Sequence, residues 1–327
     1  MEKIDFVVTW VDNSDAKWLA VRNEYSPANK KMNDENRYRE YGFFKYWFRA
    51  VEKYAPWVNK VFLVTSGHLP KWIDTNHEKL VHIKHEDYIP TEYLPTFNSN
   101  VIELNLHRIP ELSNHFVLFN DDLFLNSPTK PNDFFYKGLP KDFGIYSFCI
   151  PWLEFSSIEF NNVKTINKHF PNRRDMWENW NKYFNLGYGL TQFRTLLTFP
   201  WPHVTGYFNA HLTTSILKKN MFILWEKESE LLDQVSKHKF REITDVNQWL
   251  ISHWQVESNE FYPQKKKFGK LRYIDNYEPI INDLKKEKYK VLCINDQTDM
   301  NIDTEKAAEV ILKEFEAKFP EKSSYEL

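Results

Sequence analysis

Short apolar runs that end in polar residues alternate with stretches of helical periodicity through the first 125 residues. Strands are indicated at Phe6–Val11, Val61–Thr65, Leu80–Ile83 and Phe116–Phe119. Apolar residues at helical spacing indicate helices at 42–54 and 98–108, which end near Pro56 and Pro110. Strands and helices that alternate in this way predict βαβ units and an α/β fold with a mostly parallel sheet flanked by helices.

The second half of the chain has a looser pattern. Residues from about 127 to 200 mix Pro, Asn and aromatic side chains, which indicates an inserted or lid-like region within one domain spanning 1–327. Helices are indicated at 211–235, 244–255 and 304–318, and a late strand at Val291–Ile294. No repeat or linker divides the sequence, so we expect one domain whose helical C-terminal portion packs back onto the sheet.

The stretch FVLFNDDLFL, at 116–125, places two adjacent carboxylates inside an apolar segment. Such carboxylates repel each other, and burying either one unpaired is costly. Asp121 and Asp122 follow the fourth predicted strand, as Asp12 and Asp15 follow the first. Because ligands of parallel sheets bind beyond the carboxyl ends of strands, we expect both acid clusters to face one crevice.

The acid pair has two interpretations. Paired carboxylates at a strand end can hold Mg²⁺ or Mn²⁺, hard cations that bridge phosphates. Asn and Asp also favour tight turns, so Asn120-Asp121-Asp122 could simply reverse the chain between two strands. The second acidic strand end favours the cation site.

Several basic side chains are candidates for binding a phosphate or an acceptor hydroxyl. Arg37, Arg39, Arg108 and Arg241 could each donate paired hydrogen bonds to phosphate oxygens, or could be surface ion-pair partners. His211, which precedes a predicted amphipathic helix, is a candidate general base among eleven histidines that are mostly expected to be structural. The sequence has no Walker loop, GxGxxG, GxSxG or HExxH pattern, so spacing indicates metal-dependent phosphate chemistry and nothing finer.

Composition narrows the class of protein. With 42% hydrophobic and 17% aromatic residues and eight glycines among 327 residues, the chain is expected to be folded. The aromatic residues suit stacking on sugars or bases, and equally a packed core. A net charge of −2 without a long basic block argues against a nucleic-acid partner. The short run Lys265-Lys266-Lys267 is either a solvated loop or a contact to anionic lipid or phosphate.

The sequence also bears on cellular location. Cys149 and Cys293 lie far apart, which favours free thiols in a reducing compartment over a disulfide. The N-terminal MEKIDFVVTWVD lacks the apolar core of a signal peptide, and no apolar run approaches the roughly 18 residues of a membrane-spanning helix. We therefore expect a soluble cytoplasmic protein.

Four groups of segments resemble the Stealth family of sugar-phosphate transferases. They are IDFVVTWVDNSD at 4–15, the residues 36–72 with 97–125, GYFNAHL at 206–212 with HKFREITDVNQWLISHWQ at 238–255, and CIND at 293–296 with FPEKSSYEL at 319–327. They occur in the family's order. The family includes bacterial capsular polysaccharide phosphotransferases and the catalytic core of the animal lysosomal-enzyme N-acetylglucosamine-1-phosphotransferase. Two positions depart from the pattern, because Asn100 stands where a histidine is frequent and Thr213-Thr214 where a proline is frequent.

The resemblance implies a specific reaction. A hexose- or N-acetylhexosamine-1-phosphate would pass from a UDP-sugar to a glycan hydroxyl, leaving a phosphodiester and releasing UMP, in bacterial surface or capsular polysaccharide synthesis. Such displacement at phosphorus requires a positioned acceptor and compensation of the diphosphate charge. The acceptor is expected to be an oligosaccharide or lipid-linked, with peripheral association at the inner face of the membrane. The rival functions are a conventional glycosyltransferase that releases UDP and a non-catalytic glycan-binding module.

The resemblance also implies roles for individual residues. Asp122, His211 and Arg241 are expected to be catalytic, with His211 as base for the acceptor hydroxyl and Arg241 as phosphate clamp. Asp121 and Asp296 are expected to bind Mg²⁺ or Mn²⁺. The expected substrate contacts are Asp12, Asp15, Arg37, Arg39, Asn98, Arg108 and Asn247. Without the cation and the diphosphate, we expect raised carboxylate pKa values or a water-filled site.

Overall fold

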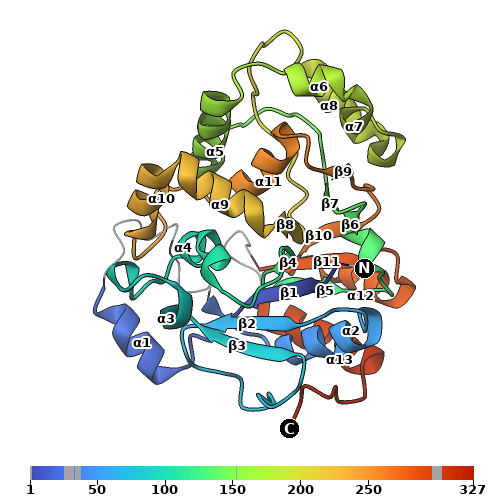
Figure 1. The fold of residues 1–327 in the computed structure, drawn as a ribbon. Coiled ribbons are helices and arrows are strands. Elements are labelled where there is room, and N and C mark those ends of the chain that lie inside the picture. The colour runs from blue at the N-terminus through green and yellow to red at the C-terminus, as the bar shows by residue number, and fades with distance from the viewer. Residues whose placement is uncertain (1, 26–32, 34–37, 152, 297–303) are drawn as a thin grey trace.

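The computed structural model describes residues 2–25, 33, 38–151, 153–296 and 304–327, so Arg37 lies outside the described residues. The central sheet has the strand order β3-β2-β1-β4-β8 (Figure 1). Its strands are β1 (Ile4–Thr9), β2 (Val61–Thr65), β3 (Leu80–Lys84), β4 (His115–Phe119) and β8 (Thr214–Leu217). β1 to β4 run parallel and β8 pairs antiparallel with β4, which confirms the expected α/β fold with a mostly parallel sheet.

Both faces of this sheet are buried. Successive strand residues point to opposite faces, so Phe6 and Val8 of β1 enter one hydrophobic core and Val7 enters another. This burial explains why the strands are continuous apolar runs instead of alternating ones. The helices on the first face are α2 (Phe44–Tyr54), α12 (Tyr277–Lys286) and α13 (Thr304–Lys318). On the second face lie α4 (Ser99–Leu104), α9 (Lys218–Lys227), α10 (Ser229–Ser236) and α11 (Trp249–Glu257).

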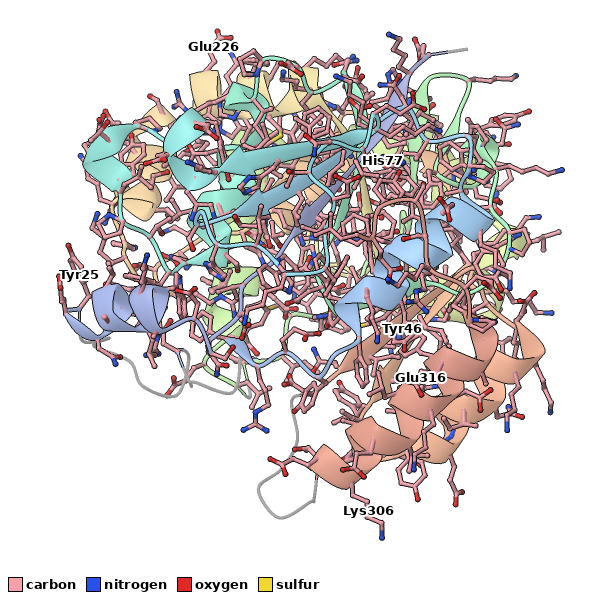
Figure 2. All side chains as sticks on the ribbon, turned by 90° about the horizontal axis from the view of Figure 1, so that it is seen from below. Tyr25, Tyr46, His77, Glu226, Lys306 and Glu316 are labelled. Carbon is pink, nitrogen blue, oxygen red and sulfur yellow. The ribbon has the colours of Figure 1, made fainter. Side chains whose placement is uncertain are left out.

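The C-terminal portion packs back onto the first face, as expected. α13 lies beside α2, where the ring of Phe315 stacks on Tyr46 with centroids 5.5 Å apart, and Glu316 lies on the same helix (Figure 2). Arg49 of α2 donates two hydrogen bonds of 2.7 Å to the carboxylate of Glu326. These contacts tie the last residues of the chain to a helix that directly covers the sheet.

A second sheet explains why the apolar run resumes after the acid pair. It has the order β10-β11-β5, with β10 (Gly269–Tyr273) parallel to β11 (Val291–Asn295) and β5 (Leu123–Leu125) antiparallel to β11. Asp121 and Asp122 form the turn from β4 of the first sheet to β5 of the second. The turn interpretation of these acids is therefore correct, and it places them where the two sheets meet.

The region predicted to be inserted contains a small sheet and several short helices. Its strands are β6 (Phe135–Tyr136) and β7 (Leu139–Asp142), which pairs with β9 (Tyr262–Pro263). Its helices are α5 (Ser156–His169), α6 (Arg174–Glu178), α7 (Trp180–Tyr183), the 3₁₀ helix η5 (Leu186–Gln192) and α8 (Phe193–Leu197). α6, α7 and α8 gather at the end of the molecule opposite the C-terminus (Figure 1). Among the described residues, no helix combines the length and the apolar character that crossing a membrane requires.

Other elements are short, and some predictions of secondary structure were wrong. The remaining elements are α1 (Ala16–Asn23), α3 (His85–Tyr88) and the 3₁₀ helices η2 (Thr91–Tyr93), η3 (Leu106–Arg108) and η4 (Pro131–Asp133). The predicted helix at 211–235 begins instead with β8, because the β-branched run Thr213 to Ile216 favours a strand. β1 ends at Thr9, two residues before the predicted end. The predicted helix at 98–108 is divided at Asn105, whose side chain donates to the carbonyl of Val101.

Candidate active site

A cavity of about 400 Å³ lies where β4 and β11 end, bounded also by the start of α4 and the turn before β8. Seven of the residues selected from the sequence line it: Arg39, Asp121, Asp122, His211, Arg241, Asn247 and Asp296. They come from segments that are far apart along the chain. The fold therefore brings them together in one cavity beyond the strand ends.

The Asp121 and Asp122 carboxylates are poorly compensated by the protein. Burial, followed by the charges of Asp122, Asp296 and Glu40, raises the pKa of Asp121 well above its usual range. Asp122 accepts hydrogen bonds through Oδ2 from the side chains of Asn295, at 3.2 Å, and Cys293, at 3.3 Å. Its buried Oδ1 has no hydrogen-bond partner among the described residues. Negative charge thus accumulates at a place where the protein provides few groups that compensate it.

This donor set fits a hard divalent cation. The carboxylates of Asp121, Asp122 and Asp296 offer the oxygen ligands that Mg²⁺ and Mn²⁺ prefer, and the unpartnered Oδ1 is available to such an ion. Potential ligand atoms of Asp122, His211 and Cys293 also lie within 4.8 Å of one another. However, burial and Asp122 raise the pKa of the Cys293 thiol well above its usual range. The sulfur is therefore a protonated donor to Asp122 and not the thiolate that a soft metal would require.

His211 is held in an unusual backbone conformation beside the acids. Its φ angle is +50°, in the left-handed region, which costs a non-glycine residue about 1–3 kcal/mol. Its N–H donates to Oδ1 of Asn209, at 2.8 Å, and its ring meets the edge of Trp249 at a centroid distance of 5.8 Å. The strained turn and the indole fix the imidazole at the cavity wall, which is the kind of constraint often found at functional sites.

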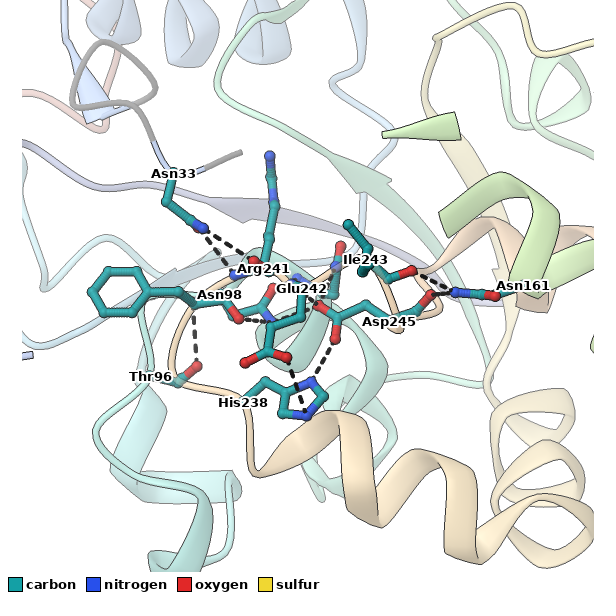
Figure 3. A network of polar contacts seen from close by, with 11 residues as sticks. Asn33, Thr96, Asn98, Asn161, His238, Arg241, Glu242, Ile243 and Asp245 are labelled. Atoms are coloured by element: carbon teal, nitrogen blue, oxygen red, sulfur yellow. Dashed lines mark hydrogen bonds and ion pairs between the residues drawn. The ribbon is translucent and has the colours of Figure 1, made fainter. Parts of the chain in front are cut away.

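Arg241 is positioned through both its backbone and its guanidinium. Its N–H donates to the side-chain oxygen of Asn33, and its carbonyl accepts from the side-chain nitrogen of Asn33, both at 3.0 Å (Figure 3). Its guanidinium donates to the hydroxyl of Ser99, the first residue of α4. These bonds hold a positive charge at the wall of the acidic cavity.

A buried network below Arg241 fixes the loop that carries it. The side chains of Asn98 and Asn100 donate to Oδ2 of Asp245 at 2.8 and 3.0 Å, and His238 donates to Oδ1 at 2.7 Å (Figure 3). The hydrogen bond to Asp245 raises the pKa of His238. Asn98 thus holds the network and does not line the cavity. Asn100, at the position where the family often has histidine, reaches both Asp245 and the cavity wall.

Four predicted substrate contacts do not line the cavity. Asp15 caps α1 by accepting from the N–H of Trp18, at 2.8 Å, and Asp12 accepts from the N–H and hydroxyl of Ser14. The expectation that these acids share the crevice of Asp121 is wrong, because β1 ends at Thr9 and the chain then turns into α1.

Asn98 belongs to the network described above, and Arg108 also lies elsewhere. The Arg108 side chain donates to Oδ1 of Asn105, at 2.9 Å, and its guanidinium lies 4.6 Å from the centre of the Trp225 ring. Asn247 does line the cavity, and its side-chain oxygen accepts from Asn162 at 2.7 Å.

Sequence reasoning missed three acids of the cavity, Glu40, Glu103 and Glu159. Burial raises the pKa of Glu103 to about 7, although Arg241 and a hydrogen bond from Asn120 oppose the shift. The sequence did contain a signal for Glu103, because this acid lies on the apolar side of a predicted helix, between Val101 and Leu104. Glu40 carries no comparable pattern, because it follows Arg39 in a loop and reaches the cavity only through the fold.

A second, smaller cavity adjoins the first. It measures about 120 Å³, and its aromatic walls come from Trp10, Trp18, Tyr38 and Phe97. The two cavities share Ser99, Asn120, Asp121 and Arg241. An aromatic compartment therefore adjoins the acidic one at a boundary that includes Asp121 and Arg241.

Fold and site together define an α/β enzyme whose cavity gathers carboxylates, an imidazole and a guanidinium beyond the strand ends. The family models described as Stealth protein conserved regions 1 and 2 match residues 2–30 and 37–142. The capsular polysaccharide phosphotransferase WcwK of Streptococcus pneumoniae is 47% identical over the whole chain and 98% of its own length. The exopolysaccharide phosphotransferase cps2G of Lactiplantibacillus plantarum is 39% identical over 99% of the chain and 96% of its own length. The chain belongs to the Stealth family, and it is an enzyme of the phosphotransferase class.

The solved structures are more distant. The crystal structure of the galactosyltransferase LgtC with donor and acceptor sugar analogs gives a TM-score of 0.42 at 10% identity, covering 96% of this chain and 95% of that one. At this level of similarity, no residue role or ligand is transferred from it.

Proposed function

We propose that this enzyme transfers a hexose- or N-acetylhexosamine-1-phosphate from a UDP-sugar to a hydroxyl of an oligosaccharide or lipid-linked acceptor. UMP leaves, and the phosphodiester becomes part of a bacterial surface or capsular polysaccharide made in the cytoplasm at the inner face of the membrane. The relatives named as capsular and exopolysaccharide phosphotransferases support this reaction class. The observation that carries the proposal is the group of carboxylates that lines one cavity with Arg241 and His211 and includes Asp122, whose buried Oδ1 has no hydrogen-bond partner among the described residues.

A divalent cation that binds together with the donor diphosphate would resolve the charge imbalance. Asp121, Asp122 and Asp296 would hold Mg²⁺ or Mn²⁺, which supplies positive charge to the diphosphate when bound. Arg241 would bind phosphate oxygens from the other side, because a guanidinium matches their geometry. Arg39, which also lines the cavity, would add a second cation.

The two adjoining cavities suggest how the donor lies. The aromatic walls of the smaller cavity suit a nucleotide base, which stacks on or packs against rings. The diphosphate would then cross the boundary formed by Asp121 and Arg241, where the cavities meet. The larger cavity has room for the transferred sugar and for the acceptor hydroxyl near His211.

The chemical step is a displacement at the β-phosphorus. The acceptor oxygen forms a bond to this phosphorus while the bond to the oxygen that bridges the two phosphates breaks. That oxygen leaves with UMP and keeps the electron pair. The acceptor proton passes to the imidazole of His211, a ring nitrogen of which lies within 4.8 Å of a carboxylate oxygen of Asp122. The strained turn of His211 and the Trp249 edge contact would keep the base oriented for this transfer.

The nucleotide product distinguishes this reaction from glycosyl transfer. If the bond from the sugar carbon to the phosphate oxygen broke instead, UDP would leave and no phosphodiester would form. The decisive assay incubates the enzyme with a panel of UDP-sugars and a lipid-linked oligosaccharide, with Mg²⁺ or with chelator. We expect UMP, only with the metal and only from the donor sugar that the larger cavity accepts. UDP as the product would overturn the proposal.

A matched pair of variants ties the assay to the site. Arg241→Ala removes the cavity guanidinium, and Arg108→Ala removes one that lies outside the cavity. We expect UMP release to fall about 10²-fold or more in the first variant, in the range of a lost electrostatic contact to a reacting group. Release should stay near the unmodified rate in the second. Equal rates in both variants would contradict a phosphate-binding role for Arg241.

A further inference from the structure

Exposed apolar side chains are concentrated in one part of the molecule. Among the described residues, thirteen of the nineteen exposed large hydrophobic side chains lie within residues 148–201. Leu186 and Leu190 are 94% and 83% exposed, respectively, and four tryptophan or phenylalanine rings of the same segment are more than half exposed. Such a concentration differs from the scattered apolar residues of an ordinary surface and marks an interaction site.

The structure of this segment is built to display these side chains. Trp177 of α6 and Phe184 both contact Phe199, with ring centroids 5.1 and 5.8 Å apart. Between the two exposed leucines of η5, Tyr188 is fully buried, and its hydroxyl donates to the carbonyl of Lys182 at 2.7 Å. The buried tyrosine anchors the turn, so that Leu186 and Leu190 project outward from a fixed support.

Positive charge borders the apolar side chains. The sequence from Asn179 to Trp225 contains no Asp or Glu, while Lys182 and Arg194 lie within it. The lysine run at 265–267 packs beside η5, because the N–H of Lys266 donates to the carbonyl of Gly187 at 2.8 Å. The ammonium of Lys266 and the guanidinium of Arg194 both lie over the ring of Phe208, at 3.9 and 5.6 Å from its centre.

We propose that this face inserts into the headgroup region of an anionic bilayer. The docking surface consists of the apolar side chains Trp177, Trp180, Leu186, Leu190, Phe193 and Leu197 with the cations Arg194, Lys265, Lys266 and Lys267. Tryptophan, phenylalanine and leucine flanked by lysine and arginine are the composition of interfacial membrane contacts. The exposed Glu178 lies between Trp177 and Trp180. The stretch from Asn179 to Trp225 contains no acid, which favours a negatively charged partner, since each Lys or Arg near an anionic surface contributes about 1 kcal/mol.

The position of the docking surface connects it to the active site. The segment that carries it also supplies Leu153 and Phe155 to the wall of the larger cavity. A bilayer at this face would present the lipid end of an acceptor at the membrane while the glycan enters the cavity. This connection rests on the proposed function, whereas the bilayer contact itself does not.

Vesicle binding tests the docking surface without any turnover. The full chain is sedimented with vesicles of phosphatidylcholine alone or with added phosphatidylglycerol, in the absence of donor and acceptor. We expect binding that increases with phosphatidylglycerol and decreases with salt. The double variant Leu186→Glu/Leu190→Glu should bind at least about tenfold more weakly, because two exposed apolar side chains are replaced by acids. Val21→Glu and Phe222→Glu, at exposed apolar positions on other helices, should bind like the unmodified chain.

A second pair of substitutions tests how far positive charge contributes to vesicle binding, and each further outcome bears on a different claim. Lys265→Glu/Lys267→Glu should weaken binding to anionic vesicles at least about tenfold and leave the weak binding to phosphatidylcholine unchanged. Unchanged vesicle binding by the leucine double variant would overturn the proposal. So would a concentration-dependent dimer that the same variant abolishes, because the face would then contact a second copy. Nucleotide release with a water-soluble oligosaccharide should be equal in the unmodified chain and the leucine variant. If neither the unmodified chain nor the leucine variant released nucleotide, the result would contradict the proposed function and not the docking surface.

Discussion

Asp245 and the acid pair Asp121-Asp122 are carboxylates of the same region that differ in how far the protein compensates them. Asp245 is fully buried, and side chains of Asn98, Asn100 and His238 donate to its two oxygens. Asp122 keeps a buried oxygen without a partner among the described residues, and burial with neighbouring acids raises the pKa of Asp121. Both oxygens of Asp245 therefore receive hydrogen bonds within the fold, whereas the charge of the acid pair is left poorly compensated.

The difference separates structural acids from binding acids. A buried carboxylate that receives a full set of hydrogen bonds orders the groups around it, here the loop that carries Arg241. Carboxylates without a full set of hydrogen-bond partners destabilise the folded protein. Such groups are retained at sites where a ligand compensates their charge. Substitutions in the two regions should therefore change different properties, which the following predictions use.

The largest effect is expected for Asp121→Asn. Removing this carboxylate should lower UMP release about 10³-fold, in the range of a lost charge-stabilising group. The free energy of unfolding of the metal-free protein should stay the same or rise, because repulsion with Asp122 and Asp296 is relieved. Turnover assays and urea denaturation with chelator check both parts. Asp12→Asn, at an acid outside the cavity, is the control, and a clear loss of stability in Asp121→Asn would place this residue with the structural acids.

His211→Ala should lower turnover about 10²- to 10³-fold, the usual contribution of a general base. Stability should change little, because alanine at φ +50° retains the backbone strain and the variant loses only the ring contact with Trp249. Steady-state rates at saturating donor give the effect on kcat. His203→Ala serves as the control at an exposed histidine. Full turnover in His211→Ala would remove histidine from the mechanism.

Asp245→Asn should show the opposite pattern to Asp121→Asn. The amide would turn a donor toward the side chains that now donate to Asp245, which costs about 3 kcal/mol in unfolding free energy. Urea denaturation measures this loss directly. Donor affinity should also fall, because the loop that carries Arg241 loses its anchor. Unchanged stability would mean that the network in Figure 3 does not hold the loop.

Glu103→Gln should change how stability depends on pH. The folded-state pKa of Glu103, at about 7, is raised by burial, so its stabilising contribution is present below about pH 4.5 and is lost as the pH rises through 7. The variant lacks this loss, so its free energy of unfolding relative to the unmodified protein should grow by on the order of 3 kcal/mol between about pH 4.5 and 8. Denaturation curves with chelator across this range supply the comparison. A constant difference between the two proteins would show that Glu103 does not titrate there.

The smallest effect is expected for His238→Gln. The hydrogen bond to Asp245 raises the folded-state pKa of His238, so its contribution is fully present below the ordinary pKa of about 6.5 and is lost as the pH rises through the raised value. We expect a loss of about 1 kcal/mol or less near pH 6, and a smaller one above pH 8. Thermal unfolding at the two pH values checks the sign. A larger loss at high pH would contradict the charged pair.

Much of the fold follows from local pattern. The bounds of β2 and α13 were predicted to the residue, because each is a clear periodic run between polar or breaking residues. The segment after His211 was not, since its apolar residues fit a helix as well as a strand until β4 provides a pairing edge. Pairing of distant strands is a tertiary property that periodicity does not contain.

The candidate site was predictable where a strand end supplies the residue. Asp121, Asp122 and Asp296 follow β4 and β11, and the rule for parallel sheets places them together. The same rule fails for Asp12 because β1 ends early and its acids serve the start of α1. Glu103 reaches the cavity from a helix face, which only the packing of α4 against the sheet reveals.

The central claim is that a divalent cation, bound together with the nucleotide diphosphate, compensates the cavity acids, as the protein itself compensates Asp245. The most direct test measures the unfolding free energy of the unmodified protein and of Asp121→Asn with and without Mg²⁺ and saturating UDP-sugar. A ligand at about 100 times its Kd should stabilise the unmodified protein by about 2.7 kcal/mol and the variant by far less. Equal stabilisation of the two proteins would show that the ligand is held elsewhere, and the account of the acid pair would fail.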